Sequence, residues 1–158
     1  MKKSTALFVL GAITASSTQA YAQKFMDVEA GPEYKSNWLH QLIFGAHWRN
    51  LWTTPMLVPV LDLKTYAGGL TVLHRGGGKQ TKGLRFQGAD GKEYKFRSIN
   101  KDPAKTLPPE LRDTLLSDIV KDQISSALPL APLVVDEFAA ALGIYQTRPS
   151  VVILPDDP

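Results

Sequence analysis

Three short segments of alternating apolar and polar residues, separated by glycine-rich turns, most limit the folds open to this 158-residue chain. They span residues 70–73, 84–87 and 93–99. Such alternation is typical of strands with one face in a core, and Asp90-Gly91 between the last two is a strong hairpin signal. Alternation predicts an apolar face of Leu84, Phe86, Tyr94 and Phe96, and a cationic face of Arg85, Lys95 and Arg97.

Helical patterns lie on both sides of this predicted sheet. Apolar residues recur at helical spacing from residue 38, with Ser36 or Asn37 as the N-cap and an end near Gly45. Two further helices are predicted at about 110–124 and 131–142, and a buried strand at 150–154. The predicted fold class is therefore α+β, a small antiparallel sheet with a Gly-rich hairpin packed against several helices.

The first 22 residues have the pattern of an export signal. Lys2 and Lys3 precede the apolar run 6–13, which is too short to span a bilayer, and Ala20-Tyr21-Ala22 matches the small-x-small cleavage rule. We therefore predict a signal peptide at 1–22, a linker at 23–35 and one domain at 36–158. The protein is expected to be exported to the periplasm or outer membrane, or secreted.

Composition excludes several classes of protein. The chain has 18 Lys and Arg against 15 Asp and Glu, and loss of Lys2 and Lys3 leaves 16 against 15, a net charge of +1. Net charge therefore gives no indication of nucleic-acid binding. The absence of Cys excludes disulfides and thiolate metal sites. No apolar run in the mature part reaches about 18 residues, so no transmembrane helix is predicted there.

The mature chain is nearly neutral overall, but its basic and acidic residues lie in different parts of the sequence. Residues 64–105 hold ten basic and three acidic residues, whereas residues 106–158 hold three basic and eight acidic ones. Two interpretations remain open. Either the helices pack on the sheet and the charges balance through weak surface pairs, or the hairpin carries a site for a polyanion, most naturally for phosphate groups.

The glycine-rich loop is the first candidate site. Glycines let backbone N–H groups approach a phosphate, and a nearby cation and hydroxyl add to its binding. The candidate phosphate- or nucleotide-binding residues here are Gly76, Gly77, Gly78, Lys79 and Thr81. The loop is not a P-loop, because Gln80 stands at the Ser/Thr position and the loop joins strands. The alternative is a flexible hairpin loop without a ligand.

Lys95 and Arg97 are the second candidate, because they share the cationic face beside the glycine-rich hairpin. A strand-borne cation next to a Gly-rich hairpin is how protein kinases hold nucleotide phosphates. Asp118 or Asp122 on the following helix is the predicted ion-pair partner. The alternative is a solvated strand face. The three His residues show no metal-ligand spacing, so no metal site is predicted.

A longer set of motifs resembles a known family. The segments are 68–70, 76–85, 90–103, 122–125 and 155–157. They are similar to a kinase-like region of large exported proteins of Bacteroidetes-type bacteria, which also carry calcineurin-like phosphoesterase and outer-membrane surface-antigen β-barrel domains. The resemblance covers about residues 36–158 and implies the small lobe of a kinase-like unit. It assigns no catalytic loop within this chain.

Three functional hypotheses follow. The first is an exported module that binds a phosphate-bearing ligand, such as a nucleotide, or an envelope partner, as a shortened family member without activity of its own. The second is a phosphotransferase-like lobe completed by a second chain. The third is a structural remnant of an outer-membrane assembly whose barrel is absent. Trp38, Phe44 and the 111–124 helix are expected to present an apolar surface to the absent lobe.

Overall fold

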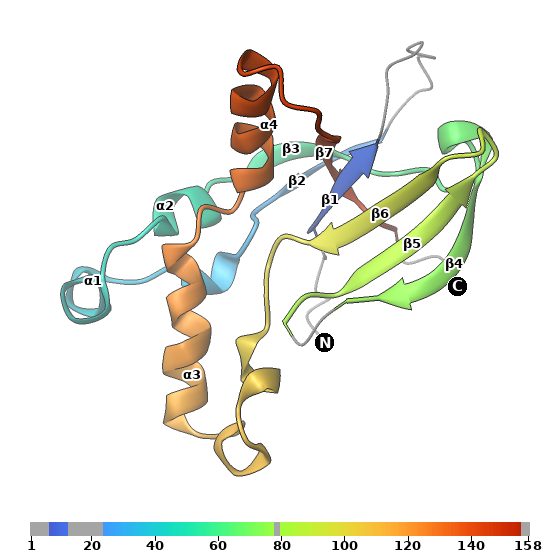
Figure 1. Ribbon diagram of the computed structural model, residues 1–158. Coiled ribbons are helices and arrows are strands. Elements are labelled where there is room, and N and C mark those ends of the chain that lie inside the picture. The colour runs from blue at the N-terminus through green and yellow to red at the C-terminus, as the bar shows by residue number, and fades with distance from the viewer. Residues whose placement is uncertain (1–6, 13–23, 78–79, 156–158) are drawn as a thin grey trace.

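A five-stranded antiparallel sheet forms the centre of the computed structural model, which describes residues 7–12, 24–77 and 80–155. The strand order is β4-β5-β6-β1-β7 (Figure 1). Their bounds are β1 Leu7–Ala12, β4 Leu70–Gly76, β5 Gly83–Gly88, β6 Glu93–Ser98 and β7 Arg148–Ile153. The strands β2 (Phe25–Val28) and β3 (Met56–Pro59) form a separate antiparallel pair. A parallel bridge between Val60 and Ile153 joins this pair to the main sheet.

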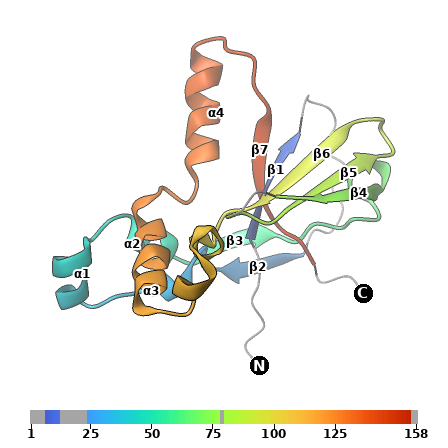
Figure 2. The same ribbon diagram turned by 60° about the horizontal axis from the view of Figure 1, so that its bottom comes forward.

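The helices gather beside one end of the main sheet, as both views show (Figures 1 and 2). They are α1 (Trp38–Phe44), α2 (Arg49–Trp52), α3 (Leu115–Asp122) and α4 (Ala131–Ala141), with short 3-10 helices at Pro32–Tyr34, Tyr66–Gly68, Pro103–Thr106, Pro109–Leu111 and Gln123–Ser126. The prediction of a mixed α and β fold with a small antiparallel sheet is therefore confirmed. The third helix begins at Leu115 rather than near 110, because the proline-rich start forms a 3-10 turn instead.

The two faces of the β4–β6 meander match the alternation in the sequence. Phe86, Tyr94 and Phe96 are buried and pack with Leu61 and Val152 in one core cluster. The register pairs Arg85 with Lys95, so these cations share the opposite face. Burial of the aromatic side chains is the main stabilising contribution on this side of the sheet.

A second core cluster joins the helices to the β2–β3 pair. Trp52 is 1% exposed and packs edge-on against Tyr34, with ring centroids 5.0 Å apart. The Trp52 indole N–H donates to the Ala127 carbonyl at 2.8 Å, which satisfies the buried donor. Desolvation in this cluster raises the pKa of Tyr34 above its ordinary value.

Local signals set the bounds of α1. The Asn37 side chain accepts a hydrogen bond from the His40 backbone N–H at 2.9 Å, as expected of an N-cap. Gly45 follows the last helical residue with a φ of 94°, a conformation that glycine adopts without steric cost. Of the two predicted N-cap residues, Ser36 and Asn37, the helix uses Asn37, and the predicted end near Gly45 is confirmed.

The structure differs from the sequence prediction in the N-terminal part of the chain. The segment predicted as a linker contributes β2 and two buried residues, Ala30 and Tyr34, so residues 24–35 belong to the fold. Residues 7–12 of the predicted signal peptide form β1. Lys2, Lys3 and the Ala20–Ala22 cleavage site lie outside the described residues, so cleavage stays a prediction.

One segment among the described residues, Leu115–Ala141, is long and apolar enough to cross a membrane when judged by length and composition. Here it is divided into α3, the 3-10 helix Gln123–Ser126 and α4, with Pro129 between the last two. The prediction that the mature chain has no membrane-spanning helix therefore stays a prediction.

Large apolar side chains are exposed on α1 and α3. Trp38 is 75% exposed, Leu42 74% and Leu115 81%, whereas Phe44 is half-buried. The two helices are neighbours, because His40 of α1 contacts Asp122 of α3. Exposed apolar side chains on neighbouring helices favour association.

We expect the purified chain to self-associate through α1 and α3, measured by sedimentation velocity over a range of concentrations. Trp38→Ser and Leu115→Ser each remove apolar contact area, and each should weaken association by about 1–2 kcal/mol, roughly tenfold in Kd. Val72→Ser is the control, because Val72 is an exposed residue on the distant strand β4. A chain that stays monomeric throughout would contradict the expectation.

Candidate functional site

A pocket of about 650 Å³ lies between β6 and α4. Lys95, Arg97 and Ile99 of the β6 segment line it, and Thr81 adds a hydroxyl from the end of the hairpin loop. Three of the predicted phosphate-site residues therefore border one cavity. The alternation that buries Tyr94 and Phe96 in the core turns Lys95 and Arg97 toward the pocket side of the sheet.

The opposite wall of the pocket is mainly apolar. It comes from α4, with Pro132, Val135 and Ala139 among the lining residues. Figures 1 and 2 show α4 rising away from the sheet, and the chain returning from its far end to β7. No residue of α4 is buried, so this wall is a free-standing helix with solvent on its outer side.

Two acceptor atoms of pocket-lining residues lack partners. The Asp136 Oδ1 and Gln146 Oε1 atoms are buried and have no hydrogen-bond partner among the residues that the structure describes. A buried acceptor without a partner costs about 1–3 kcal/mol. A ligand with an N–H or O–H group, or water, would supply the missing donor.

The cations of the pocket also lack intramolecular partners within the described part of the chain. Arg85 shares their face but pairs with Glu93, the Nη1 and Oε1 atoms being 2.6 Å apart. No ion pair or side-chain hydrogen bond of Lys95 or Arg97 is found within residues 7–12, 24–77 and 80–155. Both side chains are exposed, so an anion can reach them from solvent.

The hairpin backbone itself determines the conformation of two glycines in the predicted phosphate loop. Gly76 lies within strand β4, paired with Gly83, because the strand extends through a bulge near Leu73. At Gly77, with a φ of 129°, a Cβ would collide with the Thr81 carbonyl oxygen. Glycine is therefore required there by the chain's own backbone. Gly76 and Gly77 do not line the pocket, and Gly78 and Lys79 lie outside the described residues.

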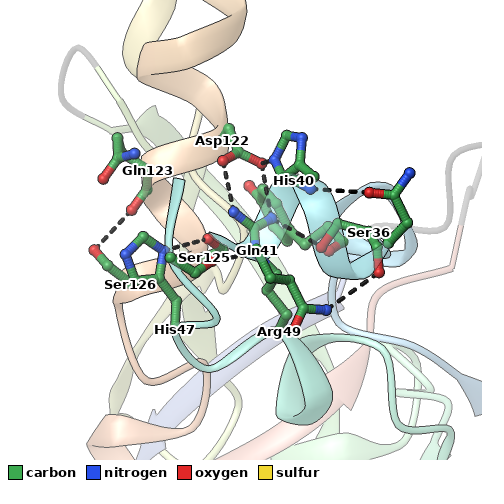
Figure 3. A network of polar contacts seen from close by, with 12 residues as sticks. Ser36, His40, Gln41, His47, Arg49, Asp122, Gln123, Ser125 and Ser126 are labelled. Atoms are coloured by element: carbon green, nitrogen blue, oxygen red, sulfur yellow. Dashed lines mark hydrogen bonds and ion pairs between the residues drawn. The ribbon is translucent and has the colours of Figure 1, made fainter. Parts of the chain in front are cut away.

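The predicted ion-pair partner of the sheet cations is wrong for Asp122. Its carboxylate pairs with the Arg49 guanidinium through two bonds, Nη1–Oδ1 at 2.8 Å and Nη2–Oδ2 at 2.6 Å (Figure 3). Asp118 lies 3.9 Å from Lys121 on the same helix. The physical reason is the position of α3, which packs beside α1 and α2 and so presents Asp122 to a buried arginine.

Arg49 is 2% exposed, and its side chain forms hydrogen bonds to residues outside α2. Its Nε–H donates to the Gly45 carbonyl at 3.0 Å, and the Asp122 carboxylate also lies 3.2 Å from His40 Nε2. The Arg49 hydrogen bonds, aided by His40, hold the pKa of Asp122 below its ordinary value of 3.8, against the desolvation that raises it. The pair therefore acts as a structural connection between α2 and α3.

A serine and a histidine also meet in this network. His47 Nδ1 lies 2.9 Å from the Ser125 Oγ, although the two residues are 78 positions apart. Ser125 is fully buried at 0% exposure, so its hydroxyl is closed to a substrate. The contact fixes the 3-10 helix Gln123–Ser126 beside α2, as Figure 3 shows, and does not make a nucleophile.

No group of three or more His, Asp or Glu residues that would hold a metal ion is found among the described residues. Comparison with protein-family models, with curated protein sequences and with solved structures finds no match to this chain. The resemblance to a kinase-like region therefore stays a prediction.

Sequence reasoning found the cations of the pocket but missed its other wall. Asp136 and Gln146 lie on a helix and a loop far along the chain, and no spacing rule connects them to β6. The pairing of Arg49 with Asp122 was equally hidden, because it joins residues 73 positions apart. An arginine within an apolar aromatic stretch (Trp48, Leu51 and Trp52) was the one signal that it is buried.

Asp122→Ala should lower the free energy of unfolding by about 3–5 kcal/mol, because it leaves the buried Arg49 charge without a partner. The double variant Arg49→Met/Asp122→Leu should recover a large part of this loss, since both charges are removed together. Urea denaturation at pH 7 measures both. Asp118→Ala is the control and should change stability by less than about 1 kcal/mol. Equal stability of wild type and Asp122→Ala would disprove the structural role.

The Asp122 contribution should depend on pH in a defined direction. Its folded-state pKa is lowered, so the stabilisation is fully present above the ordinary value of 3.8 and is lost as pH falls through the lowered folded value. The difference in stability between wild type and Asp122→Asn should therefore be constant near neutrality and shrink in strong acid. Urea midpoints over this range test it, and a difference that grows on acidification would contradict it.

Proposed function

We propose that this chain is a binding module for an amphipathic, phosphate-bearing ligand, held in the pocket between β6 and α4. The observation that carries the proposal is the position of Lys95 and Arg97 beside the apolar wall of a 650 Å³ cavity. Guanidinium and ammonium groups are the usual protein donors to phosphate oxygens. A cavity of this volume lies within the usual range for small-molecule sites.

The apolar wall argues against a bare phosphate as the ligand. Side chains such as Ile99, Val135 and Ala139 offer nothing to a phosphate group, but they exclude water from a ring or an alkyl chain. Asp136 and Gln146 add acceptors for a donor group on the ligand. A nucleotide meets these requirements with its phosphates, the apolar faces of its base and the exocyclic amino group of the base.

The kinase-small-lobe resemblance supports the same class of ligand, because such lobes bind nucleotide phosphates through strand-borne cations. Phosphotransfer needs a catalytic carboxylate and metal ligands that we do not assign to this chain, so the proposal is binding without chemistry. The expected export places this binding in the cell envelope or outside the cell. The exposed apolar surface of α1 and α3 favours a partner protein as the second element of the function.

ATP or 1-naphthyl phosphate should raise the melting temperature of the full 158-residue chain, because a ligand bound only to the folded state stabilises it. At tenfold excess over Kd the gain is about 1.4 kcal/mol, or roughly 3–6 °C. Differential scanning fluorimetry measures the shift. Arg97→Ala and Lys95→Ala should each abolish most of it, since each removes one of the cations that line the pocket.

Lys92→Ala is the matched control for these variants. Lys92 is a basic residue immediately before β6 and does not line the pocket, so its variant should keep the full shift. The absence of a shift for wild type at millimolar ligand, or an equal loss in Lys92→Ala, would rule out phosphate binding at this site.

Ala139→Phe should distinguish the pocket from a simple charged surface. A phenyl ring at this position fills the cavity beside Val135 while leaving Lys95 and Arg97 in place. The affinity for 1-naphthyl phosphate should fall at least tenfold by isothermal titration calorimetry, whereas weak binding of pyrophosphate should be unchanged. An equal loss for both ligands would contradict an apolar subsite.

A further inference from the structure

Strand β1 lies between β6 and β7 in the main sheet. It pairs with β6 along Phe8–Gly11 and with β7 along Leu7–Ala12, antiparallel on both sides. Figure 1 shows it as the blue arrow between β6 and β7. Strands β6 and β7 are therefore neighbours only through β1, and they lie about 9.6 Å apart, two strand spacings.

Removing β1 would open a slot lined by unpaired backbone groups. Its loss leaves the facing N–H and C=O groups of β6 and β7 without partners, and the slot is too wide for direct hydrogen bonds between them. Phe96 at 0% exposure and Val152 at 4% stand on the two bordering strands. The open slot would therefore expose both polar backbone and part of the apolar core.

The sequence predicts this removal. Residues 7–12 fall inside the apolar run of the export signal, and cleavage after Ala22 would detach them from the mature chain. We propose that the β6–β7 slot of the mature chain is an acceptor site for an extended strand of a partner protein, which takes the place of β1. This inference is independent of ligand binding in the pocket.

The sequence of β1 indicates the chemistry that the partner strand needs. It is uncharged and apolar, Leu-Phe-Val-Leu-Gly-Ala, and spans six residues. The partner segment must run antiparallel to both borders and lack proline, because every N–H of a central strand is used. The register sets Lys95 and Arg97 against Gly11 and Val9, so the segment should contain no Lys or Arg at those positions.

The proposal is tested by cutting the folded full-length chain between Ala22 and Gln23. A site-specific protease sequence is inserted between Ala22 and Gln23, the intact 158-residue protein is purified with this insert, and it is then cut. A fluorescent peptide with the sequence of residues 3–16 is added, and its anisotropy reports binding. We expect saturable binding to the cut protein, at least tenfold tighter than to the uncut protein, whose slot stays filled.

The matched control is the same peptide with Val9→Pro, which loses a ladder hydrogen bond and should bind at least tenfold more weakly. Hydrogen exchange gives a second measurement, in which the peptide should restore protection to the amides of β6 and β7. Unfolding of the cut chain that the peptide reverses also supports the slot. Equal binding of both peptides, equal binding to cut and uncut protein, or a cut chain that dimerises and excludes the peptide would overturn the proposal.

Discussion

The buried pair of Arg49 and Asp122 is the interaction on which the helical half of this protein depends. A guanidinium at 2% exposure cannot remain charged inside a protein without a partner, so the carboxylate at the end of α3 must lie beside α2. Asp122 stands at the C-terminal end of its helix, where the helix dipole disfavours a negative charge, and the two hydrogen bonds from Arg49 outweigh this effect. The position of α3 then determines where the chain turns into α4, and α4 is one wall of the pocket.

The pocket combines elements that the sequence places far apart. Its cations are exposed because the alternation of β6 commits the neighbouring aromatic side chains to the core. Its apolar wall is exposed because α4 packs only along one side. The same arrangement that stabilises the sheet therefore produces the surface that we propose as a ligand site.

Elements that depend on local sequence patterns could be predicted, whereas elements that depend on long-range contacts could not. The β4–β6 meander, the Asn37 cap and the Gly45 end were predictable, because each depends on residues a few positions apart. The strand β2 and the buried Tyr34 were not, because the polar residues around Gly31-Pro32 match a linker. Long-range contacts, such as that of Tyr34 with Trp52, make this segment part of the core. For the site, the faces of Lys95 and Arg97 followed from alternation. The partner of Asp122 did not, since sequence spacing favours nearby strands and gives no information on a contact across 73 positions.

The register of β1 with β7 also has a consequence for the order of events during synthesis. Leu7 pairs with Ile153, so β1 can have both of its neighbours only after almost the whole chain has been made. The meander, by contrast, joins neighbours and can form while the ribosome is still at work. The sheet is therefore completed last at β7, where the two ends of the chain meet.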